Sequence, residues 1–214
     1  MENTAAVHAS SIVFDAHCDT LLAVTAGQRE LTKRSQEGEV DIPRLQEAGV
    51  TAQVFAVFIE DEWRWRPTVQ ALRMIDHFHR AAAASDGTLR LATSARDIEE
   101  ARTAGAVGGI LSLEGAEPLD GDLSVLRMFH RLGVRAVGLT WNHRNQAADG
   151  IAESRTLGGL TEFGVELVRE LNRLGMWVDV AHLAPRGVEE VLQISEAPVI
   201  ASHANARALC PHPR

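Results

Sequence analysis

The sequence predicts an α/β fold built on a parallel sheet. Short apolar runs rich in valine and isoleucine, typical of buried parallel strands, alternate with amphipathic stretches of helix length. This alternation indicates right-handed βαβ crossovers, which occur both in open doubly wound sheets and in (β/α)8 barrels. No Gly-x-Gly-x-x-Gly motif follows the first apolar run, which weakens the case for a dinucleotide-binding fold.

Six apolar runs are predicted to form strands, and the stretches between them to form helices. The strands are expected at residues 11–15, 51–58, 107–113, 134–139, 176–180 and 198–201. Helices are expected at residues 68–84, 123–132, 161–174 and 186–194. A further helix is expected to open at Ser94, where Asp97 completes a capping box.

A complete (β/α)8 TIM barrel needs eight strands and typically about 250 residues. If the sheet belongs to a barrel, the six predicted strands are about six of its eight, and the barrel is incomplete. Residues 1–214 are predicted to form a single domain that lacks the last strands, and the abrupt end on His212-Pro213-Arg214 leads to the same expectation of a truncation. An open barrel exposes strand edges and apolar surface, so poor solubility or association of the fragment is expected, and a homodimer is one possible form of it.

The composition narrows the classes of partner and compartment. Lys+Arg 21 against Asp+Glu 29 gives a formal net charge of -8, which argues against a nucleic-acid partner. Cys18 and Cys210 form no Cys-x-x-Cys pair, so a disulfide framework is not expected. No basic segment followed by an apolar core opens the chain, and the most apolar stretch, 50–59, is too short to cross a bilayer. These features predict a cytoplasmic protein without a membrane segment.

Candidate metal ligands recur where the predicted strands end. Residues two apart in an extended segment point to the same side, so His17 and Asp19 can bind one ion. Glu114 directly follows an apolar run, where a carboxylate is costly unless it is solvated, paired or bound to a cation. His182 and His203 follow the last two runs. The carboxyl ends of barrel strands form one rim, where active sites of this fold lie.

These ligand types indicate zinc or a similar divalent ion. Five ligands exceed the three that usually hold one catalytic zinc, which favours two ions that share a carboxylate. Two such ions could hold a hydroxide at neutral pH and polarise a carbonyl, so the residues indicate a hydrolase. Cys18 lies between two of these ligands, but its side chain should point away from theirs, and packing is its expected role.

Six segments form an ordered set of short motifs. They are Phe14–Thr20, Leu113–Gly115, Gly138–Asn142 with Asn145 and Ala148–Gly150, Val178–Leu183, Pro198–His203 and His212–Arg214. In this order they resemble the motifs of the membrane (renal) dipeptidase family, peptidase family M19, in the form common among bacterial members. Each match alone is weak, but the ordered set spans nearly the whole chain and is highly specific.

This resemblance implies a zinc-dependent dipeptidase on a barrel of the metal-dependent hydrolase (amidohydrolase-like) type, with two Zn²⁺ per chain. His17 and Asp19 would hold one ion, His182 and His203 would hold the other, and Glu114 would bridge them. A bridging hydroxide would attack the peptide carbonyl of a dipeptide, with Glu114 and Asp19 as the catalytic residues.

The resemblance also implies residues that bind the substrate. Arg214 matches the family arginine that grips the C-terminal carboxylate of the dipeptide, a task suited to a planar guanidinium fork. Trp141 stands where mammalian members carry a substrate-contacting histidine, and Asn142 and His143 follow it, so all three are expected at the substrate. The family's eighth-strand aspartate, expected to serve proton transfer, would lie beyond Arg214.

Two other functions fit the same ligands. The residues themselves do not distinguish a dipeptidase from another binuclear-metal barrel hydrolase that acts on a cyclic amide, a lactone or a phosphoester. A non-catalytic metal-binding fragment also fits, because the last strands are expected to be absent. Only the family resemblance favours the dipeptidase, and a panel of substrates separates the three.

Overall fold

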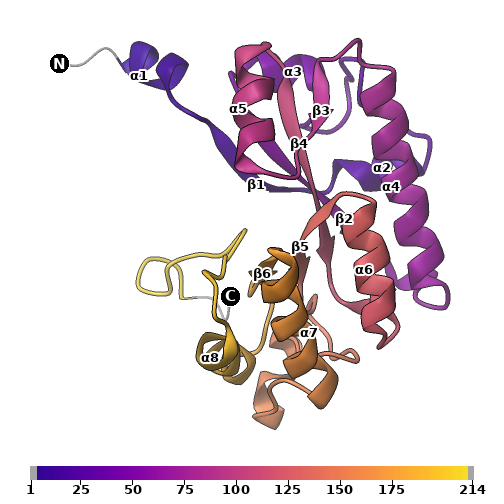
Figure 1. Ribbon diagram of the computed structural model, residues 1–214, viewed down its shortest axis with the longest axis vertical. Helices are drawn as coiled ribbons and strands as arrows, with labels where there is room; N and C mark the ends of the chain where they lie inside the picture. Colours follow the sequence, from indigo (N-terminus) through magenta and orange to yellow (C-terminus); the bar gives the residue numbers. More distant parts are fainter. Residues whose placement is uncertain (1–3, 212–214) are drawn as a thin grey trace. The chain divides into compact units, whose positions relative to one another are not determined.

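The computed structural model describes residues 4–211, in which strands and helices follow one another along the chain (Figure 1). The chain divides into two compact units. Unit 1 comprises Met1–Val57 and Leu72–Leu111, and unit 2 comprises Phe58–Ala71 and Ser112–Arg214. The long strand β4 (Val107–Glu114) begins in unit 1 and ends in unit 2.

The strands of unit 1 form a parallel sheet. β1 (Phe14–Cys18) pairs with β2 (Ala52–Phe58), and β3 (Leu89–Leu91) pairs with β4. The Gly108 N–H donates to the Thr51 carbonyl at 2.8 Å and thereby connects the start of β4 to the β2 side. The strand order is therefore β1-β2-β4, with β3 also paired to β4.

Helix α4 packs closely on the sheet of unit 1. The helices here are α1 (Thr4–Ser10), α2 (Thr20–Thr25), α3 (Ile42–Glu47), α4 (Pro67–Ala83, which starts in unit 2) and α5 (Ala95–Thr103). The Phe78 ring of α4 lies 5.3 Å from the Phe55 ring of β2, centroid to centroid. A Cβ at Gly109 would lie 2.6 Å from the Phe78 ring, so glycine at this position of β4 lets the helix approach.

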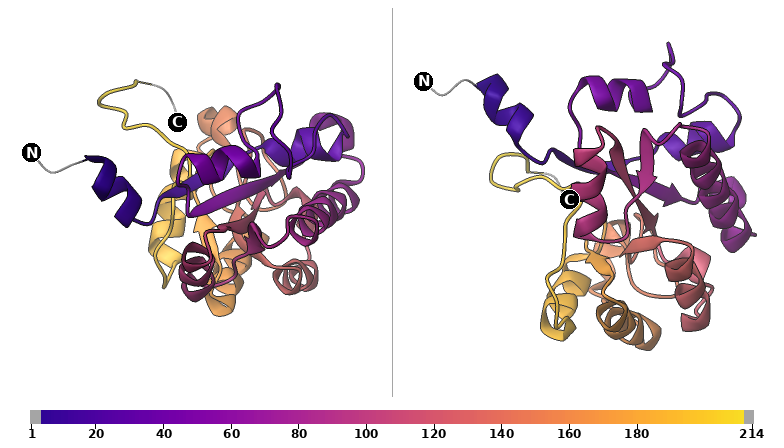
Figure 2. Two further views of the ribbon diagram at one scale, coloured as in Figure 1. Left: turned by 90° about the horizontal axis from the view of Figure 1, so that it is seen from above. Right: turned by 45° about the horizontal axis from the view of Figure 1, so that its top comes forward.

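Unit 2 contains the end of β4 and two further parallel strands. β5 (Val134–Gly138) pairs in parallel with β6 (Trp177–Asp179), and the Gly115 N–H donates to the Gly138 carbonyl at 3.0 Å. The helical elements are η1 (Asp61–Trp63), η2 (Glu117–Leu119), α6 (Leu123–Arg131), η3 (Ile151–Thr156), α7 (Glu162–Leu174) and α8 (Pro185–Ile194). Helices α7 and α8 lie side by side in Figures 1 and 2. Their buried side chains, with those of α6, include Leu126, Phe129, Leu167, Leu171 and Val191.

Most predicted elements are confirmed. Helices α4, α6, α7 and α8 begin and end within one residue of the expected ranges. Helix α5 follows Ser94, whose Oγ accepts a hydrogen bond from the Asp97 N–H at 3.3 Å, as the capping box predicts. Helix α7 ends at Gly175 in the left-handed conformation, with φ 67°.

Three strand predictions differ from the structure. The sequence does not predict β3, a three-residue strand, and β1 begins three residues later than the expected 11–15. The predicted strand 198–201 is wrong, because only Ile200 pairs with β6. Its N–H donates to Val178 at 3.0 Å and its carbonyl accepts from Val180 at 2.8 Å. The rest of the chain after α8, yellow in Figure 2, has neither helix nor strand up to residue 211.

The α/β class with a parallel sheet is therefore confirmed, and the single-domain prediction stays a prediction. No helix within residues 4–211 combines the length and the apolar character that crossing a bilayer requires.

Candidate metal centre

Three predicted metal ligands converge in unit 2. His182 Nε2 lies 3.1 Å from Glu114 Oε1 and 2.7 Å from His203 Nε2, and His203 Nε2 lies 3.6 Å from the same carboxylate oxygen. Glu114 and His182 are buried, and the His203 side chain is about one quarter exposed. Glu114 ends β4, His182 follows β6, and His203 lies in the segment after α8. The end of the sheet therefore gathers one carboxylate and two imidazoles around one point.

The backbone at His182 adopts an unusual conformation. Its φ of 66° lies in the left-handed region, which non-glycine residues adopt at a cost of about 1–3 kcal/mol unless neighbours hold them there. Two neighbours do so, since the Ile151 N–H and the Thr140 hydroxyl donate to the His182 carbonyl at 2.7 and 3.4 Å. The ring is held as well, because His182 Nδ1 lies 2.8 Å from Asn142 Oδ1.

The ring of His203 is held by a serine and a buried carboxylate. Ser202 Oγ lies 2.8 Å from His203 Nδ1, and the Ser202 hydroxyl donates to Asp179 Oδ2. Asp179 Oδ1 accepts hydrogen bonds from the Ala181 and Ser202 N–H groups at 3.0 and 3.1 Å. Asp179 therefore connects the end of β6 to the segment that carries His203. The sequence motifs contain both residues, but sequence analysis gives neither of them a role.

These contacts make the cluster a suitable cation site. The Nδ1 atoms of His182 and His203 lie at hydrogen-bond distance from Asn142 Oδ1 and Ser202 Oγ, so Nε2 is the nitrogen of each ring that faces Glu114. Both Nε2 atoms face each other and Glu114 Oε1, so a cation among them would meet two imidazole nitrogens and one carboxylate oxygen. Nitrogen and oxygen donors of this kind are those that zinc binds, at about 2.0–2.2 Å.

The predicted substrate residues Trp141, Asn142 and His143 lie in the loop after β5. The Trp141 ring lies 6.1 Å from the His182 ring, 5.8 Å from the His143 ring and 5.2 Å from the Phe58 ring. Trp141 therefore lies beside the cluster. The Asn142 side chain, in contrast, bonds to His182, which gives it a contact that the motif does not indicate.

Buried hydrogen bonds fix the shape of this loop. Asn145 Nδ2 donates to the Leu139 carbonyl at 2.9 Å, and its Oδ1 accepts from the Ala147 N–H at 2.8 Å. Asp149 is buried and accepts two hydrogen bonds from the Arg144 guanidinium and one, at 2.6 Å, from the Thr156 hydroxyl. The Arg144 contact is the main reason that the pKa of Asp149 lies below its ordinary value.

His17 and Asp19 lie together in unit 1. His17 is part of β1, Asp19 precedes α2, and His17 Nε2 lies 3.3 Å from Asp19 Oδ2. The two side chains therefore face the same side, as their spacing predicts. Cys18 between them is buried, and burial raises the pKa of its thiol to about 12, so its predicted packing role is confirmed. Arg214 lies outside the described residues, as does His212.

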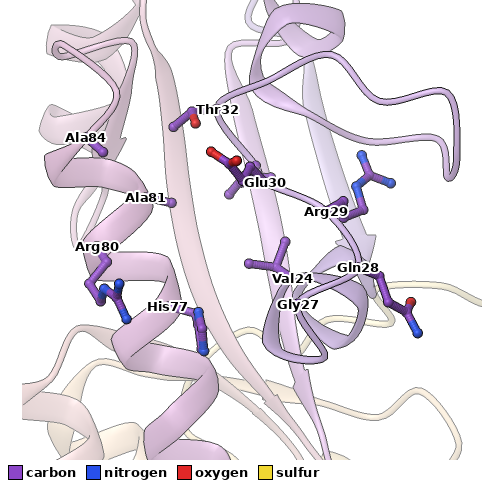
Figure 3. Close-up of a pocket in the computed structure, with 11 residues that line it drawn as sticks. Val24, Gly27, Gln28, Arg29, Glu30, Thr32, His77, Arg80, Ala81 and Ala84 are labelled. Atoms are coloured by element: carbon purple, nitrogen blue, oxygen red, sulfur yellow. The ribbon is translucent and has the colours of Figure 1, made fainter.

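A pocket of about 500 Å³ in unit 1 is separate from every predicted site residue. It lies between α4 and the loop after α2, and its lining includes Arg29, Glu30, His77 and Arg80 (Figure 3). The Arg29 guanidinium points away from His77 and Arg80 and donates to the Val40 carbonyl. The cationic groups therefore do not converge on one point, and we assign the pocket no chemistry.

Known proteins resemble this chain along nearly its whole length. The family model for membrane dipeptidase (peptidase family M19) matches residues 1–214. Dipeptidase aclJ of Aspergillus oryzae is 37% identical over 187 residues, which cover 83% of this chain and 44% of the fungal protein. Dipeptidase 3 of Homo sapiens is 37% identical over 179 residues, which cover 81% of this chain and 36% of the human protein. The chain thus spans less than half the length of these curated relatives.

Solved structures resemble it equally well. A metallopeptidase from Rhodobacter sphaeroides, liganded with a phosphinate mimic of the dipeptide L-Ala-D-Ala, matches with a TM-score of 0.87 and 28% identity over 95% of this chain and 68% of the other. Dipeptidase AC, a metallopeptidase of family M19, matches with a TM-score of 0.87 and 30% identity over 95% of this chain and 66% of the other. These neighbours have the predicted TIM-barrel fold, of which this chain covers a part. The chain therefore belongs to the membrane dipeptidase family, peptidase family M19.

Proposed function

We propose that this chain carries the metal-binding part of a zinc-dependent dipeptidase. The observation that carries the proposal is the convergence of Glu114, His182 and His203, whose donor atoms lie within 3.6 Å of one another. Membership of family M19 supports the reaction class, and the Rhodobacter sphaeroides neighbour, liganded with a dipeptide mimic, supports a small dipeptide as the substrate.

Five residues are proposed to hold two zinc ions. His182 and His203 would bind one ion, His17 and Asp19 would bind the other, and Glu114 would bridge them. The mixture of imidazoles and carboxylates supports zinc, and the number of ligands supports a pair of ions rather than one. Bound zinc supplies Lewis-acid chemistry, which polarises a carbonyl and lowers the pKa of water.

The chain's own residues bind and orient the dipeptide in this proposal. Trp141 provides an aromatic wall beside His182, and its neighbour His143 extends that wall. Asn142 lies at the same edge, where its amide can contact the substrate while its Oδ1 holds the His182 ring. Arg214 binds the C-terminal carboxylate through its guanidinium fork. Glu114 and Asp19 act as the catalytic carboxylates at the reacting atoms.

Metal analysis combined with a substrate panel tests this function. We expect about two zinc ions per reconstituted chain, with clear loss of zinc in Glu114→Ala and in His182→Ala. Glu166→Ala, on the exposed face of α7, is the matched control and should retain wild-type zinc. A chain that binds no zinc would contradict the metal centre.

The substrate arm separates the dipeptidase from the other hydrolases. We expect zinc-dependent cleavage of dipeptides, and none of cyclic amides, lactones or phosphoesters. Cleavage of one of those substrates alone, or zinc binding without any turnover in the full-length gene product, would contradict the proposed reaction. A cytoplasmic location and a homodimer stay predictions.

A further inference from the structure

We propose that Asp179 and Ser202 form a positioning relay that fixes the tautomer of His203 and so presents its Nε2 lone pair to the metal. This inference rests on the proposed metal centre, because it assigns the relay to one of that centre's ligands. Neither residue touches the centre itself, and both act through the imidazole.

The carboxylate of Asp179 has a fixed orientation. It is buried, at 5% exposure, and its Oδ1 accepts hydrogen bonds from two backbone N–H groups, those of Ala181 and Ser202. These donors cannot reverse their role, because a backbone N–H has no lone pair to offer. Oδ2 is consequently the atom that faces the Ser202 hydroxyl.

This orientation sets the direction of the next hydrogen bond. An ionised carboxylate only accepts, so the Ser202 hydroxyl gives its single proton to Asp179 Oδ2. Ser202 Oγ can then only accept from His203 Nδ1, which lies 2.8 Å away. The proton of the neutral ring is therefore held on Nδ1, and the lone pair of Nε2 points toward Glu114 and His182.

The relay predicts different effects for two conservative changes. In Asp179→Asn the amide oxygen must stay on the two backbone N–H groups, which turns the NH2 group toward Ser202 Oγ. That NH2 donates to Ser202, the hydroxyl donates to His203 Nδ1 instead, and the ring proton moves to Nε2, where it blocks metal binding. Ser202→Ala removes the relay but leaves the ring free to choose the binding tautomer.

The double variant distinguishes the relay from a purely structural role of Asp179, because the two explanations place its zinc affinity on opposite sides of that of Asp179→Asn. In Asp179→Asn with Ser202→Ala, no hydroxyl remains that could donate a hydrogen bond to His203 Nδ1. Zinc affinity should therefore recover from the level of Asp179→Asn to within a few-fold of Ser202→Ala. If Asp179 served only to hold the fold, removing a second hydrogen-bonding group would weaken binding further.

The experiment measures zinc affinity by competition with a chelating dye. Loss of an outer partner of a metal-binding histidine typically costs about 10- to 100-fold in affinity. We expect about 10-fold for Ser202→Ala and at least about 100-fold for Asp179→Asn, with recovery in the double variant. The control Ser195→Ala removes a hydroxyl that bonds to Asn172 and Ala197, away from the imidazoles, and should bind zinc like the wild type.

A second readout needs no metal. In ¹⁵N-histidine NMR spectra of the metal-free chain, His203 should carry its proton on Nδ1 in the wild type and on Nε2 in Asp179→Asn. Equal zinc affinities for the two single variants, a double variant weaker than Asp179→Asn, or an unchanged tautomer would overturn the relay. A wild-type chain that binds no zinc would contradict the proposed function, while the tautomer measurement would still decide the relay.

Discussion

Gly150 lies where the loop after β5 crosses itself, and a single added methyl group there should disturb the metal centre. A Cβ at this position would lie 2.4 Å from the Trp141 carbonyl oxygen and 2.5 Å from the Asn142 carbonyl atoms. Ordinary van der Waals contact begins at 3.4 Å, so the backbone at Gly150 and the backbone at Trp141 must move apart by about 1.0 Å. Because every clashing atom is backbone, no side-chain rotation can relieve the overlap. The Gly150 φ of −80° suits any residue, so lack of space alone opposes alanine.

The displaced segment is the one that holds His182. The Ala152 N–H donates to the Asn142 carbonyl at 2.8 Å, and the neighbouring Ile151 N–H donates to the His182 carbonyl at 2.7 Å. A shift of about 1 Å breaks or lengthens these bonds together with the contact between Asn142 Oδ1 and His182 Nδ1. Overpacking of this kind costs about 1–3 kcal/mol. We expect Gly150→Ala to lower the free energy of unfolding by about 2 kcal/mol and the zinc affinity by about 10-fold.

Urea unfolding and dye competition measure the two effects, with Gly108→Ala as the matched control. A Cβ at Gly108 meets its nearest atoms at 3.5 Å, an ordinary contact, so alanine should be tolerated there. If Gly150→Ala unfolds at the same urea concentration as Gly108→Ala and binds zinc equally well, the crowding argument is refuted. A stable variant with weakened zinc binding would instead show that the loop yields without unfolding.

Two further predictions concern ionisable groups away from the metal centre. Hydrogen bonds from Arg173, and then from Arg127, lower the pKa of Glu170 from 4.5 to about 2. Because the pKa of Glu170 is lower in the folded than in the unfolded chain, its ionised carboxylate stabilises the fold above pH 4.5, and this stabilisation is lost as the pH falls toward 2. Solvent screening at the exposed guanidiniums limits its contribution to the free energy of unfolding to about 1 kcal/mol. In urea unfolding, the free energy of unfolding of Glu170→Gln should equal that of the wild type at pH 2 and be lower than that of the wild type at pH 6. Burial raises the thiol pKa of Cys18 to about 12, so a thiol reagent at pH 8 should label the exposed Cys210 alone in the native chain and both thiols after denaturation; two reactive native thiols would contradict this.

The sequence predicts α4 to α8 well because their end signals are local, whereas it does not predict α1, α2 and α3. Ser94 caps α5 and Gly175 ends α7, and both signals depend only on residues within one turn. The strand errors have a non-local cause. Residues 198–201 have the apolar character of a strand, but their partner β6 is only three residues long. Within this run only Ile200 pairs with it, through backbone hydrogen bonds to Val178 and from Val180. β3 is equally short and makes its pairing with β4 without an apolar run of its own.

In the candidate metal centre, too, some features can be predicted from the sequence and others cannot. Glu114 and His182 are predictable because they follow apolar runs at the carboxyl ends of the parallel strands β4 and β6, whereas His203 follows an apolar run in which only Ile200 pairs. The supporting contacts are not predictable from such a pattern. Asn142 and His182 are forty positions apart, and their bond depends on a left-handed backbone at His182, which nothing in the residue type requires.

Two different physical means hold the two imidazoles of unit 2. The His182 side chain is 2% exposed, and its ring bonds to a neutral amide, so close packing and the fixed backbone restrict it. The His203 side chain is 24% exposed and lies on a segment without regular structure, where packing alone could not fix a ring. A buried carboxylate acts there instead, since Asp179 anchors the segment through the Ser202 N–H and orients the ring through the Ser202 hydroxyl. The more exposed ligand is thus the one whose ring is oriented through a buried carboxylate, that of Asp179.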